Sequence, residues 1–357
     1  MKLSRRGLLQ GCIASSVVWP LSVYGTAATD QRFILLILRG AVDGLAMIPP
    51  IGDKNYGDGR SSLVDQDTIS LNGDFGMHPA LRPMLPLWKN KQLQIIHATG
   101  LMEATRSHFA SQDLLESGVP NRYQGWLGLG LQRAFPGAKA VAVGQSVPLV
   151  LRGAEGAFSL SPKRRKQTSD TFIDLVNGMY TNDSILKEAL QQSIQTKMMS
   201  ATASNETDKH SVAGISKLLT DPDGPRVAVL EIGGWDTHSN QNNRLNRKLT
   251  QLGKIISSLQ QQLQAVWKQT TILAVTEFGR TVRENGTKGT DHGSGSAALL
   301  LGGSVSGGEV VGDWPGLRKQ DLYESRDLRI TTDIRTIFKQ QLRRLYGLNK
   351  QDLQVLF

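Results

Sequence analysis

The chain has 357 residues and a formal net charge of +10, with 39% hydrophobic and 20% charged residues. This composition is ordinary for a soluble globular protein, and the length allows one large α/β domain or two smaller ones. Aromatic residues make up only 6%, which argues against a stacking platform for single-stranded nucleic acid, so we expect no nucleic-acid partner.

The N-terminus has the pattern of an export signal. A twin-arginine sequence, SRRGLL, begins at Ser4, and an apolar run leads from it to small residues at 25–28, where a signal peptidase could cut. We predict a twin-arginine signal peptide over residues 1–28 and a single mature domain over residues 29–357. The twin-arginine translocation machinery would export this domain folded, so the protein is expected to be periplasmic or secreted. An uncleaved anchor is the alternative, but glycine, serine and proline interrupt the apolar run, and we expect no stable membrane span after cleavage.

Cysteine usage restricts the available chemistry. Cys12 is the only cysteine and lies inside the predicted signal, so the mature chain would have no disulfide, zinc-thiolate or thiol nucleophile. Any metal must then be held by Asp, Glu and His. Cleavage would remove three cations and no acid, lowering the formal charge from +10 to +7. The remaining basic cluster, KRRK at 163–166, is interpreted as a solvated surface run, with an anionic polymer or membrane surface as the alternative.

Short apolar runs alternate with helical patterns along the mature chain. The predicted strands, in chain order, are residues 33–38, 93–98, 138–143, 226–231 and 272–276, with a further extended piece at 148–156 and an apolar run at 297–301. The predicted helices are residues 80–91, which contain prolines, 107–117, 169–199, 240–268 and 333–346. Residues 201–210 are interpreted as an exposed loop or helix break. This alternation predicts an α/β fold with a doubly wound, mainly parallel sheet and helices on both faces.

Acidic and imidazole side chains gather near the ends of these strands. They are, in chain order, Asp43, Asp236, His238, Glu277, Asp291 and His292. Ligands of open α/β sheets bind beyond the carboxyl ends of the strands. Mixed carboxylate and imidazole ligation suits Zn, Mn or Fe, and carboxylate-rich sites suit Mg or Ca. A pair of such ions about 4 Å apart could promote a phosphoryl or sulfuryl displacement, with Arg280 and Arg39 neutralising the oxyanion.

Each candidate also has a purely structural interpretation. Asp43 is a common turn residue, and Asp236 could cap the following helix. Ser107 is placed to cap a predicted helix, but the same position suits a nucleophile, because the positive end of a helix favours an alkoxide or a bound oxyanion. Glu277 and Arg280 could form a surface ion pair. The occurrence of all these residues together at strand ends is what favours a metal or anion site.

Six short motifs occur in order along nearly the whole mature chain. They are LRGAVDG at 38–44, RSHFASQ at 106–112, GGWDTH at 233–238, EFGR at 277–280, GTDHG at 289–293 and DWPGL at 313–317. Together with the twin-arginine signal, they resemble the exported, uncharacterised family called domain of unknown function 1501. That family in turn resembles the alkaline phosphatase and sulfatase superfamily, whose members use a metal-bound Ser, Thr or modified Cys on a doubly wound α/β fold.

The resemblance implies an alkaline phosphatase-like fold and a role for individual residues. Ser107 matches the nucleophile at a helix N-terminus, and His108 and Arg280 would assist the oxyanion or the leaving group. The implied metal ligands are Asp43, Asp236, His238, Glu277, Asp291 and His292. Asp236 and His238 are two residues apart, whereas the corresponding pair of the superfamily is usually four apart, and a modified cysteine is impossible here.

These observations predict an exported, metal-dependent hydrolase-like protein that acts on phosphate or sulfate esters through a serine nucleophile. The cofactor would be a divalent Zn, Mn, Ca or Mg ion, and the substrate a small anionic ester. The alternative is a non-catalytic periplasmic binding or assembly protein on a degenerate alkaline phosphatase-like fold, with an envelope polymer or another protein as its partner. If the hydrolase interpretation holds, Asp43, Ser107, Asp236 and His292 should lie in one metal-sized pocket.

Overall fold

The computed structural model describes residues 29–103, 105–160 and 207–357. The signal predicted over 1–28, the basic cluster at 163–166 and the helix predicted at 169–199 lie outside the described residues, as does most of the loop predicted at 201–210. Within the described part of the chain, no helix is both long and apolar enough to cross a membrane.

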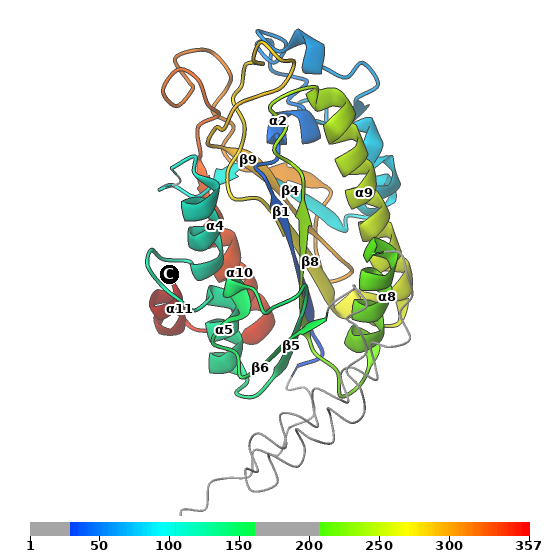
Figure 1. The fold of residues 1–357 in the computed structure, drawn as a ribbon. Helices are drawn as coiled ribbons and strands as arrows, with labels where there is room; N and C mark the ends of the chain where they lie inside the picture. Colours follow the sequence, from blue (N-terminus) through cyan, green and yellow to red (C-terminus); the bar gives the residue numbers. More distant parts are fainter. Residues whose placement is uncertain (1–28, 104, 161–206) are drawn as a thin grey trace, which may run out of the picture.

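A nine-stranded sheet passes through the centre of the molecule (Figure 1). Its strands lie in the order β10 (Glu309–Val311), β4 (Leu93–Gly100), β9 (Ser296–Leu301), β8 (Thr270–Val275), β1 (Arg32–Arg39), β7 (Val227–Gly233), β5 (Lys139–Val143) and β6 (Gly156–Leu160), and β11 (Thr332–Asp333) also pairs with β4. All pairings are parallel except those of β9, which runs antiparallel to both β4 and β8. The predicted mainly parallel sheet is therefore confirmed.

Helices cover both faces of the sheet (Figure 1). One face carries α8 (Thr207–Thr220) and α9 (Gln241–Gln262), and the other carries α4 (His108–Ser117), α5 (Trp126–Ala134), α10 (Ile334–Tyr346) and α11 (Lys350–Leu356). Strand β1 contributes to both cores, with Ile34, Leu36 and Leu38 on the α8–α9 side and Phe33, Leu35 and Ile37 on the other. A strand buried on both faces explains why the run at 33–38 is continuously apolar.

The remaining elements within residues 29–103, 105–160 and 207–357 are short. They are α2 (Gly44–Met47), α3 (Leu85–Lys89), the two-residue hairpin strands β2 (Ile69–Ser70) and β3 (Gly76–Met77), and four 3₁₀ helices at Ser61–Leu63, Pro79–Met84, Leu149–Leu151 and Gln264–Gln269. The prolines predicted to interrupt a helix at 80–91 divide it into a 3₁₀ segment and α3.

Three sequence predictions were wrong in detail. The extended piece at 148–156 is a 3₁₀ helix followed by a loop, and the edge strand β6 starts only at Gly156. The helix predicted at 240–268 ends as an α-helix at Gln262 and continues as a 3₁₀ helix that leads directly into β8. Thr207 begins α8, so the end of the loop predicted at 201–210 is helical.

Candidate metal centre

The polar segments after β7 and β8 meet the start of α4 at the carboxyl-terminal edge of the sheet (Figure 1). Asp236 and His238 follow β7, His108 is the first residue of α4, and His292 lies in the loop between β8 and β9. Ligand atoms of His108, Asp236 and His292 all lie within 4.8 Å of one another. Of the four residues predicted to lie in one metal-sized pocket, Asp236 and His292 contribute ligand atoms to this cluster, whereas the Asp43 carboxylate is engaged with Ala46, Arg60 and Gln241.

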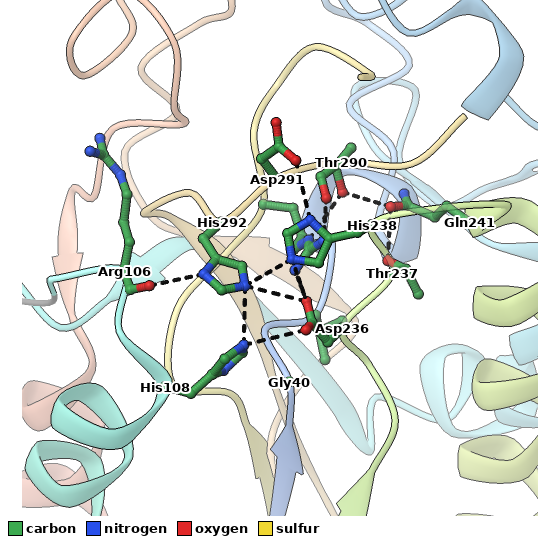
Figure 2. Close-up of polar contacts among 12 residues, drawn as sticks. Gly40, Arg106, His108, Asp236, Thr237, His238, Gln241, Thr290, Asp291 and His292 are labelled. Atoms are coloured by element: carbon green, nitrogen blue, oxygen red, sulfur yellow. Dashed lines mark hydrogen bonds and ion pairs between the residues drawn. The ribbon is translucent and has the colours of Figure 1, made fainter. Parts of the chain in front are cut away.

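Three imidazole rings and one carboxylate converge there (Figure 2). The Nε2 atom of His292 lies 3.1 Å from Nε2 of His108 and 3.0 Å from Nε2 of His238. The Asp236 carboxylate lies beside them, with Oδ1 at 3.0 Å from His238 Nε2 and 3.3 Å from His292 Nε2. Its other oxygen, Oδ2, lies 3.7 Å from Nε2 of His108.

The opposite ring nitrogen of each histidine meets a hydrogen-bond acceptor. His292 Nδ1 donates to the backbone carbonyl of Arg106 at 2.9 Å. His108 Nδ1 lies 2.8 Å from Glu277 Oε1, and His238 Nδ1 lies 3.2 Å from Asp291 Oδ1. Carbonyl and carboxylate oxygens accept but do not donate, so in a neutral ring these contacts assign the proton to Nδ1, although Nε2 of His238 also faces a carboxylate oxygen, Asp236 Oδ1, at 3.0 Å.

The position of the proton on each ring determines whether its Nε2 atom faces the candidate metal centre with a lone pair or with an N–H group. In a neutral imidazole with a protonated Nδ1, the Nε2 atom carries a lone pair. The lone pairs of His108, His238 and His292 therefore point toward one another and toward the Asp236 carboxylate. Lone pairs facing each other at about 3 Å repel unless a cation lies among them. Metal-bound histidines usually donate their other ring N–H to a carboxylate or carbonyl, and the pattern here is of that kind. The donor set therefore fits a divalent cation.

Asp236 is held in place from behind by Arg280. The buried guanidinium places Nη1 2.6 Å from Asp236 Oδ1, donates from Nε to Thr290 Oγ1 at 3.1 Å, and also bonds the Thr290 carbonyl. Burial alone would raise the pKa of Asp236, but the hydrogen bond and charge of Arg280 hold it below its ordinary value. The carboxylate is therefore charged at neutral pH.

Electrostatics also favour neutral, ligand-competent imidazole at His292. Burial lowers the pKa of His292, and the charge of Arg280 acts in the same direction, against the hydrogen bond to the Arg106 carbonyl and the charge of Asp236. Hydrogen bonding from Asn285 lowers the pKa of Asp291, so this carboxylate stays charged opposite His238.

Glu277 lies behind His108 and is fully buried. Its Oε1 accepts from Gly40 N at 2.8 Å and from Gln112 Nε2 at 3.1 Å, in addition to His108 Nδ1. Its Oε2 accepts from Thr276 Oγ1 at 3.0 Å. The predicted role of Glu277 as a direct ligand remains a prediction, but its contacts are those of a residue that orients His108.

Asp43 lies outside the cluster of imidazoles. Its Oδ1 caps α2 by accepting from Ala46 N, and its Oδ2 lies 2.8 Å from Arg60 Nη2 and 2.5 Å from Gln241 Nε2. Gln241 Oε1 in turn accepts from Thr237 Oγ1 at 2.8 Å and Thr290 Oγ1 at 2.6 Å, as Figure 2 shows. The structure thus places Asp43 in a buried network behind Arg280, with both of its oxygens engaged.

Ser107 lies directly before the centre. It is the N-cap of α4, its side chain is exposed, and it makes no capping hydrogen bond. Its backbone carbonyl accepts from Ser111 N at 2.9 Å. The hydroxyl is therefore not committed to the helix it begins, while the adjacent His108 is part of the cluster.

Several contributing residues were missed from sequence. Arg106 acts through its backbone carbonyl, and Gln112, Gln241, Arg60 and Thr290 act through hydrogen bonds to other site residues. A carbonyl has no residue-type signal, and glutamines in helices are indistinguishable from surface residues. Arg106, Gln112 and Thr290 lie within the quoted motifs and Gln241 lies shortly after one, which is their only sequence signal, whereas Arg60 lies outside all of the motifs.

Comparison with known proteins places this chain in a family. The model of the family described as "Protein of unknown function (DUF1501)" matches residues 76–357, and the chain belongs to that family. No curated protein matches the chain.

Solved structures match with low identity. The zinc complex of the C-terminal periplasmic domain of EptC from Escherichia coli is 10% identical, with 78% of this chain and 74% of that chain covered and a TM-score of 0.41. A 2-O GAG sulfatase is 10% identical, with 89% and 71% covered and a TM-score of 0.41. A protein in the alkaline phosphatase superfamily from Vibrio parahaemolyticus is 10% identical, with 80% and 64% covered and a TM-score of 0.36. Overlaps of this size say nothing about the reaction, which has to be inferred from the residues of this chain.

Proposed function

We propose that this protein is an exported, metal-dependent hydrolase of phosphate or sulfate esters. The divalent ion would be held by His108, Asp236 and His292, with His238 as a further ligand or as a residue beside the ligands. Ser107 would be the nucleophile. The observation that carries the proposal is the orientation of the three imidazoles. Each Nδ1 is bound to an acceptor, and the Nε2 atoms converge on the Asp236 carboxylate.

The chemistry of the donor set narrows the choice of metal. Imidazole nitrogens with one carboxylate suit Zn, Mn or Fe better than Ca or Mg, which prefer oxygen ligands. When bound, such an ion would act as a Lewis acid toward an anionic ester. Glu277 and Asp291 would hold His108 and His238 in orientation through their Nδ1 protons, and Arg280 would hold Asp236.

Ser107 is supported as the nucleophile by its position. An uncommitted hydroxyl at the first turn of the ten-residue helix α4 lies in the field of that helix, whose positive end stabilises developing negative charge. His108, the next residue, lies with Nε2 among the candidate ligand atoms.

The first experiment measures metal content. Elemental analysis of the protein purified without chelator should find a divalent transition metal in the wild type. Asp236→Ala and His292→Ala should both lose it, because each removes a converging ligand atom. His78→Gln is the control, since His78 caps a 3₁₀ helix and pairs with Asp65, and it should retain the metal. A wild type that stays metal-free after incubation with Zn or Mn would contradict the proposal.

The second experiment tests the nucleophile. With the metal bound, Ser107→Ala should keep its metal content and lose hydrolysis of aryl phosphate or sulfate esters by at least about 1,000-fold in kcat. Ser239→Ala is the matched control, because Ser239 is an exposed serine next to His238 and has no place in the proposed reaction. Full turnover by Ser107→Ala would remove Ser107 from the mechanism.

A non-catalytic binding or assembly protein is the second candidate, and the placement of the arginines favours it. Arg280 is buried and engaged with Asp236, and Arg39 lies 2.6 Å from Glu116 and 2.7 Å from Glu231. Both arginines that could neutralise an ester oxyanion are thus paired with carboxylates. Retention of metal without turnover of phosphate or sulfate esters would support this candidate over the hydrolase.

A further inference from the structure

Arg106 has an unusual backbone conformation next to the candidate metal centre. It is not a glycine, yet its φ is +60°, in the left-handed region. Such a conformation costs on the order of 1 kcal/mol or more, and persists only where the surroundings hold it. The carbonyl that this conformation presents accepts the Nδ1 proton of His292 at 2.9 Å (Figure 2).

A fully buried carboxylate holds the side chain of Arg106. Asp327 Oδ2 lies 2.8 Å from Arg106 Nε and 2.7 Å from its Nη2, a two-point contact with one oxygen. Glu324 binds the same Nη2 at 2.5 Å, and the guanidinium lies 5.7 Å from the centroid of the Tyr323 ring. Arg106 is therefore held by three residues of one short segment, 323–327.

The same segment also holds the loop that carries His292. Asp327 Oδ2 accepts from Ser294 Oγ at 2.9 Å, and Arg326 Nη2 donates to the His292 carbonyl. The adjacent Leu328 carbonyl accepts from Gly295 N at 2.9 Å. One buried carboxylate thus connects the segment before His108 with the segment after His292.

We propose that Asp327 is a positioning residue for the metal centre. It fixes Arg106 in the left-handed conformation, so that the Arg106 carbonyl takes the Nδ1 proton of His292 and leaves Nε2 free to bind a cation. Asp327 acts through Arg106 and touches neither metal nor substrate. The part of this inference that concerns metal affinity rests on the proposed function, whereas the part that concerns the His292 tautomer does not.

The test is the Asp327→Asn variant, examined with two measurements. Nitrogen-15 NMR of the metal-free protein should show His292 as a single Nδ1-protonated tautomer in the wild type and as a mixture of tautomers in the variant. Competition with a chromophoric chelator should show zinc affinity reduced by about 10- to 100-fold, the effect expected when the partner of a metal-bound histidine is lost.

Two further variants separate positioning from general destabilisation. Asp321→Asn makes the same chemical change in a surface pair with Arg318, 2.6 Å apart, and should change neither measurement. Arg106→Lys keeps the charge but loses the two-point contact, so it should shift the tautomer in the same direction even if Asp327→Asn does not fold.

The outcomes distinguish this inference from the proposed function. An unchanged His292 tautomer in Asp327→Asn and Arg106→Lys would overturn the inference, whether or not the wild type binds zinc. A wild type that binds no zinc, with the tautomer shift present in the variants, would overturn the proposed function and leave the positioning role in place.

Discussion

Glu277 illustrates at the scale of one residue how a buried carboxylate can orient a histidine of the candidate metal centre. Four donors surround its two oxygens, including Gly40 N and His108 Nδ1. A buried carboxylate with this many hydrogen bonds is fixed in position. The sequence predicted that Glu277 lies near the end of the strand β8. Its distance from the candidate metal centre could not be predicted, because it depends on how the loop at 289–293 folds.

Asp43 is a second carboxylate that the sequence placed at the site, but its contacts are with residues that stabilise the fold. It pairs with Arg60 at 2.8 Å, and the side chains of both residues are almost completely buried, with 1% and 0% exposed. Breaking a buried pair leaves one charge uncompensated, which typically costs about 3–5 kcal/mol.

We therefore predict that Asp43→Asn lowers the free energy of unfolding by about 3–5 kcal/mol, because Arg60 loses its charged partner. The folded variant should retain its metal. Urea unfolding and elemental analysis of the same preparation measure the two effects.

The control for this prediction is Asp58→Asn, which changes an exposed aspartate of the same loop and should alter stability by less than about 0.5 kcal/mol. If Asp43→Asn instead keeps its stability and loses metal, Asp43 is a ligand, as the sequence resemblance implies.

The sequence predicted which kinds of residue form the site, namely aspartate and histidine, better than it predicted which individual residues belong to it. Asp236 and His292 were predicted as ligands, and His108 as an oxyanion or leaving-group helper; the structure brings ligand atoms of all three together. Nothing in the sequence separates them from Asp43, because an aspartate after a strand can face the ligand side or turn into the core. The outcome depends on partners distant in sequence, such as Gln241 for Asp43 and Arg280 for Asp236.

At the scale of elements, glycines bring the motif loops into backbone contact. A Cβ on Gly40, whose φ is +118°, would lie 2.7 Å from the backbone nitrogen of Asp236. A Cβ on Gly289 would lie 2.2 Å from the carbonyl oxygen of His238. Real Cβ atoms do not approach so closely, so these glycines allow the loops after β1, β7 and β8 to pack together. The abundance of glycine in the motifs therefore follows from the convergence of three strand ends.

Elements with strong local signals were predicted well. The five runs assigned as strands correspond to β1, β4, β5, β7 and β8, and α4 and α10 end at Gly118 and Gly347 with positive φ values of 81° and 68°. The direction of β9 could not be predicted, because a buried apolar run has the same pattern in a parallel and an antiparallel strand. The edge strand β6 was missed because its residues are mostly half-buried and lack a continuous apolar run.

At the scale of the whole molecule, the buried histidine His97, which lies outside the candidate metal centre, makes the free energy of unfolding depend on pH. His97 lies in β4 with 2% of its surface exposed and contacts the rings of Phe75 and Trp314. Its Nε2 donates to the Ile48 carbonyl at 2.9 Å, while its Nδ1 accepts from Ala98 N at 2.8 Å. Both ring nitrogens are thus satisfied only in the neutral form.

Burial lowers the pKa of His97 to about 4 from an ordinary value of 6.5, despite the opposing effects of the Ile48 carbonyl and the Asp43 charge. Between these two values the unfolded chain binds a proton at this position and the native protein does not. The contribution of neutral His97 is therefore fully present above pH 6.5 and is lost as the pH falls toward 4, by on the order of 3 kcal/mol.

We predict that the wild type loses more stability than His97→Gln when the pH is lowered from 7 to 4.5. Glutamine removes the titrating group and keeps hydrogen-bonding capacity, and the other ionisable groups contribute equally to both proteins, so their effects cancel in the difference. Urea unfolding across this range measures the two free energies. A difference that stays constant with pH would mean that His97 titrates alike in the native and unfolded states, and that the surroundings of His97 in β4 are more hydrated than their packing indicates.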